Sequence, residues 1–184
     1  MKQPLLLSFF LLLYTLVPVP AHATDAIWVL VDTEKLQLKV KRGNKTLATM
    51  KNIAIGQNGA GTKTHKGDDM TPLGSYKIGW INNKSRFNKF YGFNYPSIKN
   101  AETAFLSGLL TEKEYHSNLK AHKNKKVPSQ NTTIGGYIGI HGLGAANKDI
   151  HKLLNWTHGC VALTNEQIEL LSQWVGKGTV VKVK

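Results

Sequence analysis

The chain contains a single cysteine, Cys160, in the stretch NWTHGC, and His141 precedes it by 19 positions in the stretch YIGIHG. The thiolate is the nucleophilic form of cysteine, and a free thiol has a pKa of about 8.5. A neighbouring histidine can act as the base that activates the thiol. The two residues therefore have the side-chain types needed for cysteine-based acyl transfer, if the fold brings them together.

The turn before Cys160 offers backbone N–H groups to a negatively charged oxygen. Gly159 can adopt a positive φ and let substrate approach the backbone closely. The successive amides of His158, Gly159 and Cys160 could then stabilise a tetrahedral acyl-transfer intermediate. Two alternatives stay open, a buried cysteine that packs as a small hydrophobe and a metal site with His141. The paired spacing typical of structural zinc sites is missing from the sequence, which argues against the metal.

Regular elements are predicted on both sides of this pair. The apolar segment IGGYIGIHG predicts a short strand that runs into His141. Residues 164–175 predict a helix, because Thr164 and Gln167 match a capping box. Cys160 would stand just before that helix. A strand end and a helix entrance are rigid places from which to hold two side chains close together.

The first part of the chain has the pattern of a β-meander. Alternating apolar residues predict strands between 25 and 55; they are Val29, Val31, Leu36, Leu38 and Val40. The stretches DTEK and RGNK predict hairpin turns. Residues 56–74 are rich in Gly, Thr and Lys and predict a loop, residues 75–81 a strand, and GTVVKVK a closing strand. We expect a mostly β fold.

Residues 97–126 contain good helix formers and predict a helical insertion between strands. Thr111 and Glu114 match a capping box, so one helix is expected to begin near residue 112. An earlier helix, near 99–107, is expected to end at Gly108. The insertion has two interpretations, an active-site lid or structural packing.

The first residues predict export. Lys2, an apolar run over residues 5–17 and the small-residue stretch AHA describe a secretory signal peptide that is cleaved after Ala23. The run is too short for a comfortable membrane span, and no second apolar segment of spanning length follows. Residues 24–184 then suit one domain with a real core, located in the periplasm or cell wall.

The composition of the chain indicates which kinds of binding partner it favours. The formal net charge is +13, which favours anionic partners. Outside the cytoplasm an anionic wall polymer or membrane surface fits better than nucleic acid. The plainer interpretation is that scattered lysines keep the protein soluble. In an oxidising compartment a lone cysteine can form no internal disulfide, so its thiol is reactive, paired with another molecule, or buried. Nothing in the sequence indicates the oligomeric state.

The stretches IHG (140–142) and WTHGCVALTN (156–165) resemble the signature of the YkuD-type L,D-transpeptidase catalytic domain. That signature is a His, a spacer, and then Ser/Thr-His-Gly-Cys. Fifteen residues separate His141 from Thr157 here, which matches the family's spacing. The stretch DDMTPLGSYKI (68–78) is similar to the family's upstream TPxG motif. The resemblance covers nearly all of residues 25–184.

The resemblance implies a β-sandwich-like catalytic domain with Cys160 as the nucleophile and His141 as the general base. The carbonyl of Gly142 would orient His141. The residues that would line or brace the oxyanion site are Thr157, His158 and Gly159. Family members attack the bond between the L-centre of meso-diaminopimelate and terminal D-Ala in peptidoglycan stem peptides. They release D-Ala and pass the acyl group to an amine or to water, without a metal or cofactor.

One position departs from the pattern of many family members, which carry Arg two places after the cysteine. Ala162 stands there, and the sequence is similar to a subgroup with the motif WTxGC-[IV]-A. Carboxylate recognition and the choice of acceptor are therefore open. Candidate substrate-binding residues are His65, Tyr91 and Ala162. His65 could equally be a solvated loop residue and Tyr91 a core residue, while His151 is expected at the surface. We expect a transpeptidase; the alternatives are an L,D-carboxypeptidase or amidase, and a catalytically silent wall-binding protein.

Overall fold

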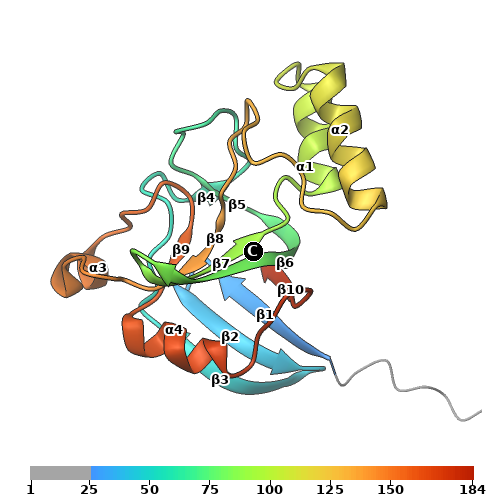
Figure 1. Ribbon diagram of the computed structural model, residues 1–184. Helices are drawn as coiled ribbons and strands as arrows, with labels where there is room; N and C mark the ends of the chain where they lie inside the picture. Colours follow the sequence, from blue (N-terminus) through green and yellow to red (C-terminus); the bar gives the residue numbers. More distant parts are fainter. Residues whose placement is uncertain (1–25) are drawn as a thin grey trace, which may run out of the picture.

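The computed structural model describes residues 26–184. The predicted signal peptide, residues 1–23, lies outside the described residues. Across residues 26–184, no helix is both long enough and apolar enough to cross a membrane. Figure 1 shows a twisted sheet at the centre, with two helices together at one end of it and α4 at the other.

A mixed sheet of eight strands forms the centre of the described chain, in the order β3-β2-β1-β10-β6-β7-β8-β9. The strands are β1 (Ile27–Asp32), β2 (Gln37–Arg42), β3 (Lys45–Lys51), β6 (Gly74–Ser85), β7 (Asn88–Phe93), β8 (Gly139–His141), β9 (Val161–Ala162) and β10 (Val180–Val183). A separate pair joins β4 (Ala60–Gly61) to β5 (Thr71–Pro72). In the large sheet, β1 with β10 and β8 with β9 are parallel. The predicted mostly β fold is confirmed.

The first three strands form the predicted meander. Turns over residues 33–36 and 43–44 join them, which confirms the two predicted hairpins. Val29 and Val31 are fully buried, because alternate side chains of a strand point to the same face. Leu36, which the alternating pattern placed in a strand, lies in the first turn with φ of 46°. The third strand ends at Lys51 rather than near residue 55.

The long strand β6 connects two parts of the sheet. Its first residues, 74–77, pair with β10, and residues 78–85 pair with β7 through two register shifts. At the sheet's far edge, the Ala162 amide donates to the Ala54 carbonyl at 2.8 Å, and the Ala54 amide donates back at 3.0 Å. The chain that follows β3 therefore pairs with β9, which brings the two edges of the sheet together.

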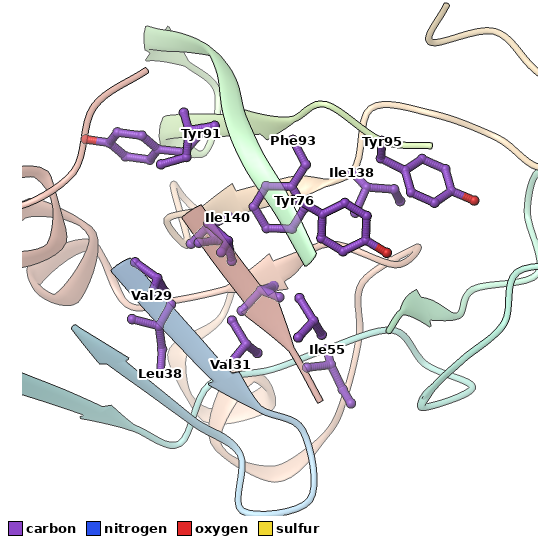
Figure 2. Packing of buried hydrophobic residues seen from close by; sticks show 14 of the residues in the cluster. Val29, Val31, Leu38, Ile55, Tyr76, Tyr91, Phe93, Tyr95, Ile138 and Ile140 are labelled. Atoms are coloured by element: carbon purple, nitrogen blue, oxygen red, sulfur yellow. The ribbon is translucent and has the colours of Figure 1, made fainter. Parts of the chain in front are cut away.

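Buried aromatic and branched side chains pack together against the strands (Figure 2). The rings of Tyr76 and Phe93 stack with their centroids 5.3 Å apart. Tyr91 and Tyr95 are 2% and 1% exposed. Tyr91 is therefore a core residue, and the alternative interpretation of it as a substrate-stacking residue is wrong.

The helical insertion consists of α1 (Ile98–Leu106) and α2 (Glu112–Lys123), which pack together at one end of the domain (Figure 1). The predicted capping box of Thr111 and Glu114 is present, and α2 begins at the predicted residue. A second box, from Ser97 and Asn100, starts α1. The stacked rings of Phe105 and Tyr115, with centroids 4.7 Å apart, join the two helices.

Two further helices flank the cysteine. Helix α3 spans Lys148–Leu153 and α4 spans Asn165–Ser172, with the predicted Thr164–Gln167 capping box at the start of α4. Helix α4 ends three residues before the predicted end at 175, where the chain turns toward β10. Strand β8 is shorter than the predicted strand over 134–142. Gly135 and Tyr137 have positive φ, which bends the backbone out of extended geometry.

Candidate active site

A cleft of about 1150 Å³ opens beside β8 and β9. Its walls come from the β6–β7 hairpin, from residues 136–146 around β8, and from the turn at 156–160. Both Cys160 and His141 line it. No residue of the insertion 97–126 does, and Ala101 and Ala104 of the insertion are buried in the core.

His141 stands at the end of β8 and is 3% exposed. Its Nδ1 donates a hydrogen bond to the carbonyl oxygen of Gly142, at 2.7 Å. With the proton on Nδ1, the lone pair of the neutral ring is on Nε2. Burial lowers the pKa of His141 to about 4, and the bond to Gly142 only partly opposes this. The ring is therefore neutral at pH 7 and able to accept a proton.

Aromatic side chains hold the imidazole of His141 in place. Phe87 stacks on it with ring centroids 4.4 Å apart, and Trp156 meets it edge-on at 5.8 Å. Gly142 lets the β6–β7 hairpin approach, because a Cβ at this position would lie 2.6 Å from the Phe87 carbonyl oxygen. The contacts restrict both the position and the tilt of the ring.

Cys160 immediately precedes β9, which runs parallel to β8 with Ile140 opposite Val161. This pairing of neighbouring strands places Cys160 and His141 on the same cleft. The thiol donates to the carbonyl of Tyr137, with 3.4 Å between sulfur and oxygen. Burial raises the pKa of Cys160 to about 11, although a backbone hydrogen bond and the positive charge of Lys63 act in the opposite direction. The resting thiol is therefore protonated.

The turn before Cys160 is braced from within. The hydroxyl of Thr157 donates to the Cys160 carbonyl at 2.6 Å and accepts from the Gly159 amide at 3.2 Å. Gly159 has φ of 115°, and a Cβ there would lie 2.6 Å from the carbonyl oxygen of Met70. Because its amide is engaged by Thr157, Gly159 is not a free oxyanion donor. Of the three amides expected to act together, those of His158 and Cys160 are the candidates.

The loop over residues 56–74 packs against the turn that precedes Cys160. Asp68 forms a buried ion pair with Lys63, and the Met70 amide donates to the Asp68 carboxylate at 3.1 Å. Lys63 also donates to the Met70 carbonyl at 3.3 Å, which is the group that abuts Gly159. The sequence did not predict this pair, although Asp68 stands three residues before Thr71, where the TPLG stretch begins.

His158 links the turn to the same loop. Its Nδ1 lies 2.7 Å from Oδ1 of Asp69, and its side chain is 82% exposed. Of the other residues considered from the sequence, His65 is exposed and lies outside the cleft lining. Ala162 is fully buried in β9 and does not line the cleft. The structure therefore gives neither of these two a contact with the cleft.

His151 was expected at the surface, but it is 3% exposed. It lies in α3 and accepts a hydrogen bond from the indole of Trp156. Within residues 26–184, no three His, Cys, Asp or Glu side chains are grouped so as to hold a metal ion.

Several solved structures of other proteins resemble the fold of this chain. The helical cell shape determining protein Pgp2 of Campylobacter jejuni has a TM-score of 0.61 at 23% identity, over 88% of this chain and 48% of that one. Bd1075 of Bdellovibrio bacteriovorus has a TM-score of 0.51 at 18% identity, over 90% and 49%. An L,D-transpeptidase of Enterococcus faecium has a TM-score of 0.51 at 14% identity, over 88% and 50%.

At these identities the likeness shows a shared fold, and the chain spans about half the length of each of these proteins. No curated protein sequence matches the chain. Residues 26–183 match the model of the YkuD family, described as the L,D-transpeptidase catalytic domain. Because this match covers most of the sequence, and includes both His141 and the turn that ends in Cys160, the chain belongs to the YkuD family of L,D-transpeptidase catalytic domains.

Proposed function

We propose that this protein is an exported cysteine acyltransferase that acts on peptidoglycan stem peptides in the periplasm or cell wall. It cleaves the bond between the L-centre of meso-diaminopimelate and terminal D-Ala, and it transfers the acyl group to an amine. The observation that carries the proposal is the placement of Cys160 and His141 on one cleft by two neighbouring parallel strands. The positive net charge of the chain suits an anionic wall polymer.

In the first half-reaction, Nε2 of His141 takes the thiol proton as Sγ of Cys160 attacks the peptide carbonyl. The C–S bond forms, and the electron pair of the C=O π bond moves to oxygen. The amides of His158 and Cys160 stabilise that oxyanion. Collapse of the intermediate breaks the C–N bond, His141 returns its proton to the leaving amine, and D-Ala departs from a thioester.

In the second half-reaction, an amine of a second stem attacks the thioester carbonyl while His141 takes a proton from it. Collapse breaks the C–S bond, and the proton returns to the thiolate. Because the pKa of His141 is about 4 and that of Cys160 about 11, a standing thiolate–imidazolium pair is disfavoured in the free enzyme. The proton therefore moves as the C–S bond forms, which is general base catalysis.

The size of the cleft supports an amine as the acceptor. Its volume of about 1150 Å³ exceeds the range of roughly 300–1,000 Å³ typical of single small-molecule sites. It therefore has room for donor and acceptor stems together. With water as the acceptor, the same thioester would yield an L,D-carboxypeptidase.

The acyl-enzyme is tested by intact-mass measurement with a carbapenem, whose strained carbonyl acylates a reactive thiol. We expect one covalent addition to the wild type and none to the Cys160→Ala variant. Equal labelling of both proteins would contradict the assignment of Cys160.

The complete reaction is tested by incubating the protein with purified disaccharide-tetrapeptide and weighing the products. A cross-linked dimer together with free D-Ala supports transpeptidation. Tripeptide alone shows that water is the acceptor, and an unchanged tetrapeptide with folded protein favours a silent wall-binding protein. Cys160→Ala serves as the matched inactive control.

A further inference from the structure

The hairpin between β6 and β7 brings two positive charges to the cleft. Lys84 and Arg86 are both exposed residues of this hairpin, and both line the cleft. Among the ion pairs formed within residues 26–184, neither side chain takes part. The cleft therefore holds cations that the fold itself does not neutralise.

Arg86 is linked to the candidate base through the ring of Phe87. Its guanidinium carbon is 4.7 Å from the centroid of the Phe87 ring, and the Phe87 ring stacks on His141. The guanidinium and the imidazole thus contact the same aromatic ring. Consistent with this, burial lowers the pKa of His141 most strongly, and the charge of Arg86 lowers it further.

The backbone of Arg86 packs on the loop that follows His141. The Gly142 amide donates to the Lys89 carbonyl at 3.2 Å. Gly144 has φ of 62°, and a Cβ there would lie 2.2 Å from the Arg86 carbonyl oxygen. Two glycines after His141 therefore let the hairpin pack directly on the loop that follows the base.

We infer that Arg86 determines specificity by binding the carboxylate of the leaving D-Ala, an inference that rests on the proposed function. His141 must protonate the leaving amine, so the D-Ala residue must lie against the imidazole. One carbon atom separates that amine from the carboxylate, and the guanidinium stands on the adjoining ring. A guanidinium can bind a carboxylate through two parallel hydrogen bonds.

Position 162 does not supply this charge, because alanine is uncharged. Ala162 is also fully buried and outside the cleft lining. His158 also lines the cleft, but its Nδ1 is engaged by Asp69. Lys84 shares the hairpin with Arg86 without the ring contact, which makes it the matched control.

The test compares two substrates, the stem tetrapeptide with a free D-Ala carboxylate and the same peptide ending in D-Ala carboxamide. For Arg86→Gln we expect kcat/KM for the free acid to fall about 10- to 100-fold, as for a lost hydrogen bond to a charged group. The carboxamide should react at the wild-type rate. Lys84→Gln should preserve the preference for the acid, and Arg86→Lys should recover part of it because only the charge remains.

Binding of both peptides to Cys160→Ala, with and without Arg86→Gln, gives a second measurement that needs no turnover. Equal losses for acid and carboxamide would overturn the inference, because they would show that Arg86 only positions His141. An equal effect of Lys84→Gln would also overturn it in favour of diffuse charge. Release of no D-Ala by the wild type would instead overturn the proposed function, and the inference with it.

Discussion

The indole nitrogen of Trp156 donates a hydrogen bond to Nδ1 of His151, 3.2 Å away. The Trp156 ring also meets His141 edge-on. A buried histidine on α3 thus fixes the side chain that lies against the candidate base. Because Nδ1 must accept this bond, His151 is neutral with its proton on Nε2. Burial lowers the pKa of His151, which favours the same form.

Replacing His151 tests this support. His151→Phe keeps a planar ring but leaves the Trp156 N–H without its acceptor, which we expect to cost about 1–3 kcal/mol of unfolding free energy. A displaced indole should also lower kcat/KM about 10- to 100-fold through misplacement of His141. Denaturant titration and D-Ala release measure the two effects. His151→Gln retains an acceptor and should recover most of both losses. Equal effects of Phe and Gln would show that the hydrogen bond is unimportant.

The pH dependence of D-Ala release should follow the pKa of His141, which burial lowers to about 4. The base works only when neutral, so kcat/KM should lose activity only as pH falls toward 4. Burial raises the pKa of Cys160 to about 11, so the thiol adds no limb to the profile between pH 4 and this value. We expect a flat profile from about pH 5 to pH 10. An acid limb near pH 6.5 would instead indicate a histidine with an ordinary pKa.

Stability should respond to the same titration. Between its ordinary pKa of 6.5 and its folded pKa of about 4, His141 binds a proton in the unfolded chain but not in the folded protein. The unfolding free energy therefore falls as pH decreases through that window, by about 3 kcal/mol in total. Urea titrations at pH 7 and pH 4.5 measure this loss. His141→Gln removes the titrating group, so a loss of equal size in that variant would contradict its assignment to His141.

Local signals in the sequence predicted the local structure well. The capping boxes at Thr111 and Thr164 identified helix starts correctly, because a cap is satisfied within four residues of chain. Alternating apolar residues identified the strands of the first hairpins, because that pattern is also local to a short segment. The His and Cys of the candidate site were found from their spacing and motif, which needed no knowledge of distant contacts.

These local signals could not predict which distant segments of the chain pair with each other. The parallel pairing of β1 with β10 and the closure of Ala54 on Ala162 join residues far apart in the sequence, and no periodicity encodes them. No signal in the sequence singled out Arg86 and Phe87, since the contact of Phe87 with His141 depends on how the hairpin folds back. His151 looked solvated because a single histidine in a short polar helix carries no sign of which face is covered.

The backbone at Gly159 should tolerate no side chain. Its φ of 115° and the 2.6 Å gap from a Cβ to the Met70 oxygen predict that Gly159→Ala displaces the cysteine turn. We expect a loss of about 1–3 kcal/mol in stability and about 100-fold or more in kcat/KM. Gly176 has open space around its Cβ position and no positive φ, so Gly176→Ala should change stability by less than about 0.5 kcal/mol. Wild-type activity in Gly159→Ala would show that the turn can relax.

The ion pair of Lys63 and Asp68 should matter mainly when only one partner is removed. Both residues are buried, at 4% and 8% exposure. Lys63→Met leaves the Asp68 carboxylate uncompensated, which we expect to lower the unfolding free energy by about 3–5 kcal/mol. The same variant should lose acylation rate, because the charge of Lys63 lowers the pKa of Cys160 and its ammonium holds the Met70 carbonyl.

A double-mutant cycle separates the charge from the rest of the loop. Lys63→Met with Asp68→Asn removes both charges. The single Asn oxygen can replace only one of the two Asp68 oxygens, which accept from the Thr64 amide at 2.8 Å and from the Met70 amide at 3.1 Å. Stability should therefore recover in part in the double variant, whereas carbapenem acylation should stay slow because the positive charge is still missing. Equal recovery of stability and acylation would show that Lys63 acts on Cys160 only by keeping the loop folded. Additive stability losses would show that the two side chains do not interact.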